Sequence, residues 1–170
     1  MKRHIIGIIA GAVALISLVL PWWMLKVGNE VYVSWYVWGP NGVVPSGNGT
    51  GILTYIALIL IVVCGILALL SSIRIDNKGK KRMLIAGISA LLSIIIFAIV
   101  MISWIPSAWI NVNSIFYSGL FDPRGGPTAN AYLYFGFWIA LIATILAFVA
   151  YFMYPKVEET AEATQPDTPE

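Results

Sequence analysis

The chain has 170 residues, of which 59% are hydrophobic and only 11% are charged. A soluble domain is about 45–50% apolar and about 25% charged, so this chain has too little polar surface to cover a water-soluble particle. Its formal net charge of +2 gives no reason to expect nucleic acid as a partner. One cysteine and one histidine exclude an internal disulfide, a thiolate metal cluster and a site built from several imidazoles.

Four apolar segments are each long enough to cross the hydrocarbon core of a membrane, which takes about 20 residues. None of the four contains Asp, Glu, Lys, Arg or His. Lipid offers the backbone no hydrogen bonds, so continuous apolar segments of this length predict helices rather than barrel strands. We therefore expect an all-α membrane protein, a four-transmembrane-helix bundle with helices at residues 5–25, 51–73, 83–104 and 131–154.

The first predicted helix, residues 5–25, ends in the sequence LPWWML. Its apolar stretch is longer than the core of a secretory signal peptide, and no small-residue cleavage motif follows, so we expect an uncleaved membrane anchor. Trp22 and Trp23 lie near its outer end, where an aromatic belt normally marks the membrane surface. We expect both tryptophans to be interfacial anchors.

The first outer loop, residues 26–50, contains the aromatic and β-branched stretch VYVSWYVW at residues 31–38. This composition predicts a β-strand, closed by a turn at the sequence GPNG, residues 39–42. Alternation does not say which of the two strand faces is buried. One face carries Val31, Val33, Trp35 and Val37, and the other carries Tyr32, Ser34, Tyr36 and Trp38.

A lone hairpin is marginally stable in water, so this strand needs a further partner. Residues 109–117 of the second outer loop, residues 105–130, are apolar enough to supply one. We therefore expect a small extracellular β-sheet that rests on the helix ends. The alternative is that these aromatic residues lie on the bilayer as an interfacial loop.

The orientation follows from the basic residues, because lysine and arginine concentrate on the cytoplasmic side of membrane proteins. Eight of the ten lie on the side of the chain termini, which places both termini in the cytoplasm and two loops outside. The inner residues are Lys2, Arg3, Arg74, Lys78, Lys80, Lys81, Arg82 and Lys156, and the outer ones are Lys26 and Arg124.

Residues 1–155 thus form one predicted transmembrane domain, and residues 156–170 differ sharply from it in composition. This last segment has five acidic side chains, two prolines and no aromatic residue. Such a segment buries too little apolar surface to fold alone, so we expect a disordered acidic cytoplasmic tail.

Small residues repeat at helical spacing within two of the predicted spans. Gly7 and Gly11 form a GxxxG motif, and Gly136 and Ala140 have the same spacing in the fourth span. Small residues allow close helix approach, so these positions predict packing within the bundle, with self-association as the alternative.

Candidate chemistry is sparse, and we predict no catalytic, cofactor or metal site. His4 follows basic residues at the predicted inner surface and is expected to be an interfacial anchor. Cys64 lies mid-span, where a thiol acts as a small apolar filler. Ion-coupled transport would lack its usual residues, because no span contains an ionisable side chain.

Four spans with cytoplasmic termini, the sequence LPWW at residues 20–23 and the sequence WYVWG at residues 35–39 together resemble the claudin and peripheral myelin protein superfamily. In that family the first span ends near a Pro-x-Trp, and the first outer segment forms an antiparallel sheet with a tryptophan-bearing motif. The resemblance implies a claudin-like fold. The family's two cysteines in the first outer loop are absent here, and the resemblance does not carry over paracellular sealing.

These features predict a non-enzymatic membrane scaffold or interaction protein. Its partners are expected to be the lipid bilayer and another membrane or envelope protein, with a second copy of this chain as one option. An accessory subunit of a membrane enzyme or respiratory complex, packing or binding lipid or quinone through uncharged helices, is the first alternative. An enzyme with an outward-facing aromatic pocket is the second. The predicted interaction residues are Tyr32, Trp35, Tyr36, Trp38, Trp109 and Arg124.

Overall fold

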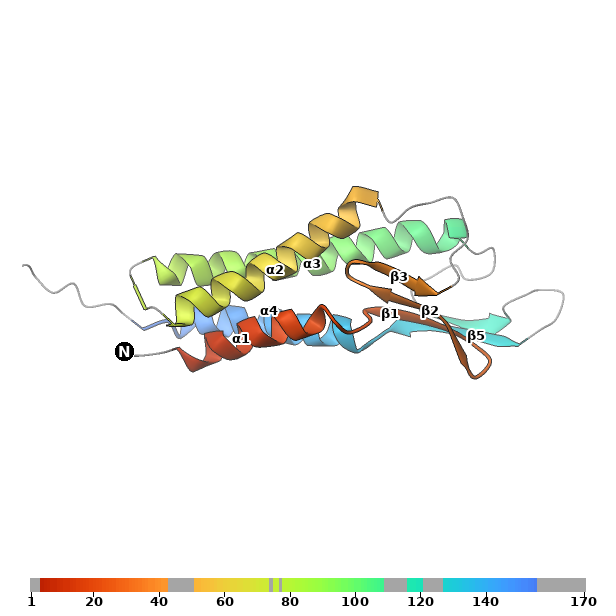
Figure 1. Cartoon of the computed structure of the whole chain (residues 1–170), viewed down its shortest axis with the longest axis horizontal. Coiled ribbons are helices and arrows are strands. Elements are labelled where there is room, and N and C mark those ends of the chain that lie inside the picture. The colour runs from red at the N-terminus through yellow and green to blue at the C-terminus, as the bar shows by residue number, and fades with distance from the viewer. Residues whose placement is uncertain are drawn as a thin grey trace, which may run out of the picture.

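The computed structural model describes residues 4–42, 51–73, 75–76, 78–108, 116–120 and 127–155. Within these residues, four helices form a bundle at one end of an elongated molecule and five strands form a sheet at the other end (Figure 1). The helices are α1 (Ile5–Ser17), α2 (Gly51–Ile73), α3 (Gly79–Ala108) and α4 (Phe135–Phe152). The strands are β1 (Trp23–Val27), β2 (Glu30–Tyr36), β3 (Gly39–Gly42), β4 (Tyr117–Leu120) and β5 (Thr128–Leu133).

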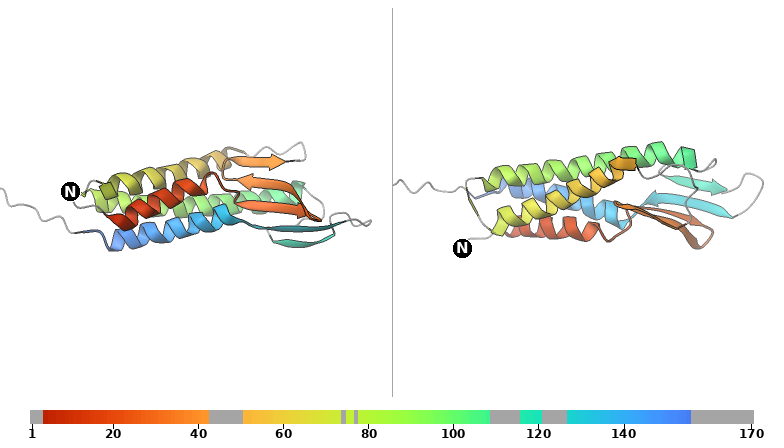
Figure 2. Two further views of the ribbon diagram at one scale, coloured as in Figure 1. Left: turned by 60° about the horizontal axis from the view of Figure 1, so that its bottom comes forward. Right: turned by 45° about the horizontal axis from the view of Figure 1, so that its top comes forward.

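The four helices pack as a ring in which α1 and α3 each contact both α2 and α4. The start of α1, the end of α4 and the link between α2 and α3 all lie at the end of the bundle away from the sheet (Figures 1 and 2). The last part of α3 extends beyond the bundle and runs beside the sheet in each view. The bundle and the sheet therefore form one continuous body.

Three helices are long and apolar enough to cross a membrane: α2, α3 and α4. The fourth helix, α1, has 13 residues, which at 1.5 Å per residue gives about 20 Å, less than the hydrocarbon core of about 30 Å. The predicted first helix is thus wrong beyond Ser17. Pro21 has no backbone N–H and disfavours helical geometry at Leu20, so the helix ends before it.

The limits of two further helices, α3 and α4, differ from the prediction, whereas α2 has the predicted limits. α3 begins four residues earlier and ends four residues later than the predicted residues 83–104. α4 begins at Phe135 instead of residue 131, because residues 128–133 form β5. An apolar segment with many aromatic residues suits a strand as well as a helix, and composition alone does not separate the two.

A small sheet is present as predicted, and its strand order is β3-β2-β1-β5-β4 with every neighbouring pair antiparallel. The predicted pairing partner was wrong, because β2 lies between β1 and β3 instead of beside residues 109–117, of which residues 109–115 lie outside the described residues. It combines strands from both predicted outer loops. The sequence GPNG, predicted as a turn, is instead the edge strand β3, and the chain reverses at Val37 and Trp38. Gly39 has a φ of 141°, which L side chains rarely adopt, so the glycine permits this reversal.

The structure decides which face of β2 is buried. Val33, Trp35 and Val37 are fully buried, whereas Tyr32 and Tyr36 are half-buried. The buried side chains join those of β1 and of the helices in one contiguous core. The predicted alternation is therefore confirmed from Val33 to Val37, and its apolar face is the inner one. It is wrong at Val31, which is 51% exposed because the register shifts between this residue and Val33.

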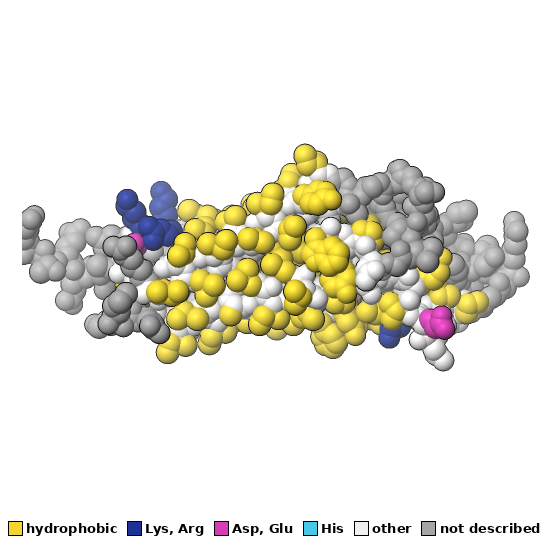
Figure 3. Space-filling model, in the orientation of Figure 1, with side chains coloured by type: hydrophobic (Ala, Val, Ile, Leu, Met, Phe, Trp, Pro, Cys, Tyr) yellow, Lys and Arg dark blue, Asp and Glu magenta, His cyan; other side chains and the backbone are white. Residues whose placement is uncertain are grey.

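The helix surfaces carry large apolar side chains that are exposed along α1, α2, α3 and α4. Figure 3 shows this apolar surface, with basic side chains gathered at the far end of the bundle and charged side chains again at the sheet. Water-soluble monomers rarely expose a contiguous apolar surface of this extent. Together with the three long helices, it indicates a membrane protein.

Candidate interaction surface

One face of the sheet points away from the core, and we call it the outer sheet face. Strand pairing places Met24 between Ser34 and Tyr132, and Lys26 beside Asn130, which in turn pairs with Ser118. The register shifts between Leu25 and Lys26, a bulge that increases the local twist. Met24 is buried on this side of the sheet, at 7% exposed, and the accessible side chains, which form the outer sheet face, are Lys26, Val31, Ser34, Tyr36, Ser118, Asn130 and Tyr132.

Contacts between these side chains hold the outer sheet face in a fixed arrangement. Lys26 Nζ lies 5.9 Å from the centroid of the Tyr132 ring, and the Tyr132 hydroxyl donates to Met24 Sδ at 3.8 Å. The Ser118 hydroxyl donates to Asn130 Oδ1 at 2.9 Å. Tyrosine, serine and asparagine with one cation make a polar, partly aromatic surface, which is the composition of many protein-recognition surfaces.

Trp38 continues this surface toward the bundle. Its ring stacks on Tyr36 with centroids 4.5 Å apart, and 44% of the residue is exposed. Its indole N–H donates to the carbonyl oxygen of Leu18 at 3.0 Å. Trp38 therefore satisfies a carbonyl group at the end of α1 while it presents a ring face to the surroundings.

Trp22 fills the junction between the bundle and the sheet. Its indole N–H donates to the Ser17 carbonyl at 2.9 Å, and its ring meets Phe97 and Phe137 edge-on at 5.0 and 6.1 Å between centroids. Trp22 and Trp23 are both fully buried, so the prediction that they are interfacial anchors is wrong. They are buried because the chain turns inward after Pro21 and enters the sheet.

Gly136 lets α4 approach this junction. A Cβ atom there would lie 2.5 Å from the Leu20 carbonyl oxygen and 2.7 Å from that of Pro21, and it would also clash with the Trp22 ring. The Gly136 N–H donates to the Pro21 carbonyl at 2.8 Å. Ala140, one turn further along α4, is fully buried.

The GxxxG motif lies between α1 and α2. A Cβ at Gly7 would clash with the side chains of Ser72 and Met83, and one at Gly11 would lie 2.8 Å from the Gly65 carbonyl oxygen. Gly7 and Gly11, like Gly136 and Ala140, thus have contacts inside one copy of the chain, and none of the four lies on its surface.

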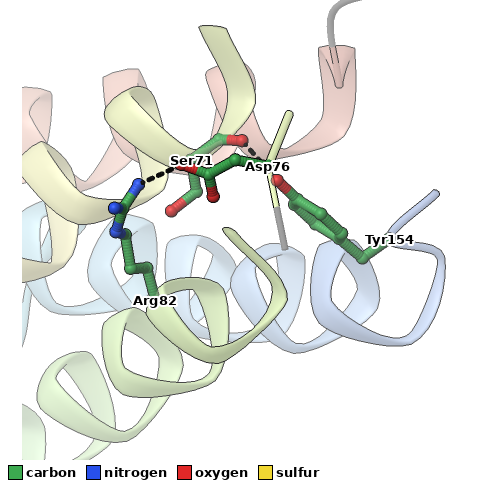
Figure 4. A network of polar contacts seen from close by, with 4 residues as sticks. All are labelled: Ser71, Asp76, Arg82 and Tyr154. Carbon is green, nitrogen blue, oxygen red and sulfur yellow. Dashed lines mark hydrogen bonds and ion pairs between the residues drawn. The ribbon is translucent and has the colours of Figure 1, made fainter. Parts of the chain in front are cut away.

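A second set of polar contacts closes the far end of the bundle, and Tyr154 is at its centre (Figure 4). The Tyr154 hydroxyl donates to the Ser71 carbonyl at 2.8 Å and packs against Gly79, at the start of α3. The Tyr154 ring stacks on the His4 ring at 5.5 Å between centroids. This single residue therefore links the ends of all four helices.

His4 and Asp76 complete this end. His4 is buried, and its Nδ1 accepts a hydrogen bond from the Gly7 N–H at 3.3 Å, so it caps α1 and is not the interfacial anchor that we predicted. Asp76 accepts from Arg82 at 3.1 Å. Burial raises the pKa of the Tyr154 phenol above its ordinary value of about 10; a backbone hydrogen bond at Asp76 opposes this shift, and the negative charge of the Asp76 carboxylate adds to it.

The predicted interaction residues have different positions in the structure. Tyr36 and Trp38 lie side by side at the surface, and Tyr32 is half-buried against the core. Trp35 is fully buried on the inner face of the sheet, where burial of its large apolar ring is favourable. It is therefore a core residue and does not contact a partner, contrary to the prediction. Trp109 and Arg124 lie outside the described residues.

The sequence argument missed Lys26, Asn130 and Tyr132. The signal for the last two was available: residues 128–133, TANAYL, alternate polar and apolar with the period of a strand. The strand pattern was missed because residues 131–133 belong to the apolar segment that was predicted as the fourth helix. The position of Lys26 depends on pairing between distant segments, so it had no local signal.

Among the described residues, no three His, Cys, Asp or Glu side chains come together as metal ligands would. Cys64 is buried within α2. Comparison with known proteins finds no protein-family model and no curated protein that matches this chain.

Proposed function

We propose that this protein is a multi-pass protein of the cell membrane, with both termini in the cytoplasm and the sheet outside. The exposed apolar helix surfaces and the basic residues at the far end of the bundle support this orientation. Because α1 is short, residues 18–22 cross part of the membrane as irregular backbone. Such backbone is tolerated in a membrane where its polar groups are satisfied within the protein.

The structure contains hydrogen bonds that meet this requirement. The Trp22 N–H donates to the Trp35 carbonyl at 2.7 Å, and the Trp22 carbonyl accepts from the Tyr134 N–H at 2.9 Å. The Pro21 carbonyl accepts from Gly136, and the indole groups of Trp22 and Trp38 satisfy the end of α1. A short first helix is therefore compatible with a transmembrane position.

We infer that the protein works without enzymatic chemistry, as a scaffold that contacts another membrane or envelope protein through the outer sheet face. The observation that carries this proposal is the asymmetry of the sheet. Its inner face is buried on the helices, whereas its outer face presents Tyr36, Tyr132 and Lys26 with Trp38 beside them. Aromatic and basic side chains on a rigid support are frequent anchors of protein interfaces.

A claudin-like fold remains part of this proposal. Four helices with a five-stranded antiparallel sheet at one end correspond to the architecture that the resemblance implies. The proposal concerns the fold, and it does not include the sealing function of that family.

Site-specific photo-crosslinking in intact cells tests the proposed surface. A photoreactive phenylalanine analogue at position 36 or 132 should give protein adducts. The same analogue at Ile142, which is 51% exposed on α4, should give none. The same photoreactive group stands at each position, so a difference in adducts reports the location of that group.

The contrary outcome has a definite meaning. Protein adducts at position 142 alone would favour the accessory-subunit alternative, with contact through the helices. That alternative has to use an exposed helix face, because Gly136 and Ala140 are buried within the chain. Adducts at none of the three positions would reject a function based on protein contact.

A further inference from the structure

A stripe of exposed apolar side chains runs along α3, and Lys81 stands at its start. Residues at spacings of three and four share one face of a helix. From Lys81, alternating steps of four and three residues pass through isoleucine and leucine side chains, each of which is between 42% and 60% exposed. The stripe consists of Ile85, Ile88, Leu92, Ile95, Ile99 and Ile102.

The basic side chains at the start of α3 differ in their charge partners. Arg82 pairs with Asp76 at 3.1 Å, whereas Lys78, Lys80 and Lys81 are exposed and have no ion pair within the described part of the chain. Lys80 lies 5.3 Å from the centroid of the Tyr151 ring, on the neighbouring helix α4. Figure 3 shows basic side chains at the end of the bundle where the apolar surface begins. Of the three lysines without an ion pair in the described residues, Lys80 and Lys81 lie on α3 itself, whereas Lys78 precedes it.

A second apolar stripe begins beside Lys80. Phe152 is 77% exposed in the last turn of α4, and Val149 and Ile145 follow it at the same helical spacing. Cations at the end of two neighbouring apolar stripes match a molecule that has an anionic head and hydrocarbon chains. A soluble acidic protein would meet the charges and leave the stripes uncovered.

We propose that this end of the bundle binds an anionic glycerophospholipid. The lipid phosphate contacts Lys81 and Lys80, and its acyl chains lie along the α3 stripe from Ile85 to Leu92. The phosphate lies at the end of the bundle away from the sheet, because Lys81 precedes Ile85 by one helical turn, about 6 Å. An anionic membrane surface attracts each nearby lysine with an energy that corresponds to about a fivefold change in affinity.

The test uses the full-length protein reconstituted in nanodiscs that contain equal amounts of phosphatidylglycerol and phosphatidylcholine. After mild extraction, native mass spectrometry counts the two lipids that remain bound. We expect phosphatidylglycerol to be enriched, and K81Q or K80Q to lower that enrichment about fivefold each. K81R should retain it, and K26Q, at the sheet end, should leave it unchanged.

A competition experiment separates the lipid from its headgroup alone. Glycerophosphoglycerol carries the same phosphodiester and headgroup without acyl chains, so at equal concentration it should not displace phosphatidylglycerol. Displacement would overturn the role of the α3 stripe. Equal retention of the two lipids, or the same loss in K26Q as in K81Q, would overturn the proposal as a whole. Since all four variants change exposed or half-buried side chains, helical content by circular dichroism should be unaltered.

Discussion

The substitution Gly136→Ala tests whether the junction between bundle and sheet is packed as the structure shows. In the interior of a helix, replacing glycine by alanine normally stabilises by about 0.5–1 kcal/mol, since glycine loses more conformational freedom on folding. Here we expect the opposite sign. The added Cβ would lie 2.5 Å from the Leu20 carbonyl oxygen and 2.7 Å from that of Pro21.

The magnitude follows from these contacts. Overpacking typically costs about 1–3 kcal/mol, and the atoms in the way belong to the backbone, which cannot rotate aside. Moving that backbone also strains the hydrogen bond from the Gly136 N–H to the Pro21 carbonyl, which contributes about 1 kcal/mol. After the gain in helix propensity is subtracted, we expect Gly136→Ala to lower the free energy of unfolding by about 2–3 kcal/mol.

Gly87→Ala is the matched control, because it makes the same change in α3. A Cβ there would meet the Phe148 ring at 3.2 Å, and a side chain can shift by a few tenths of an ångström. We therefore expect a change of less than about 1 kcal/mol. Equilibrium unfolding by sodium dodecyl sulfate in mixed micelles, followed by circular dichroism, measures both variants. If Gly136→Ala proves as stable as the wild type, or if both variants lose the same amount, the packing argument is refuted.

Three further predictions use other parts of the molecule. Trp35→Ala should lower the free energy of unfolding by about 3–5 kcal/mol and Trp38→Ala by clearly less, since only Trp35 is fully buried. Thermal melting in detergent compares the two variants, and equal losses would contradict the assignment of Trp35 to the inner face of the sheet. Because burial raises the Tyr154 pKa, the folded state holds the phenol proton more tightly than the unfolded chain does. Its contribution to stability is complete below about pH 10 and is lost as the pH rises through the folded-state pKa, so wild type should lose more stability than Tyr154→Phe as the pH rises above about 10. For topology, a cysteine at Asn41 should react with an impermeant maleimide added to intact cells and one at Lys78 should not, whereas the reverse pattern would invert the orientation.

The sequence by itself predicted a membrane protein and most of its helical content, and the three long apolar helices agree with both. An apolar run such as residues 51–73 leaves no choice in lipid, because only a helix satisfies its backbone, and α2 has those limits. The period-two pattern around Trp35 likewise predicted a strand and, from Val33 onward, the side chains that share a face. These features depend on neighbours within a few residues, which is why sequence patterns contain them.

The tertiary structure decided where the helical and extended segments end and which surfaces meet. In the apolar segment that begins at Ile5, Pro21 accounts locally for the end of the helix. The residues after it form a strand because Trp22 and the β1 backbone find partners in β2 and β5, more than a hundred residues away in the second case. The same pairing buries Trp22 and Trp35, exposes Tyr36 and brings Lys26 onto Tyr132. Local composition gives equal support to a lipid-facing tryptophan and a buried one, since both are apolar environments. Only contacts between distant segments distinguish the two.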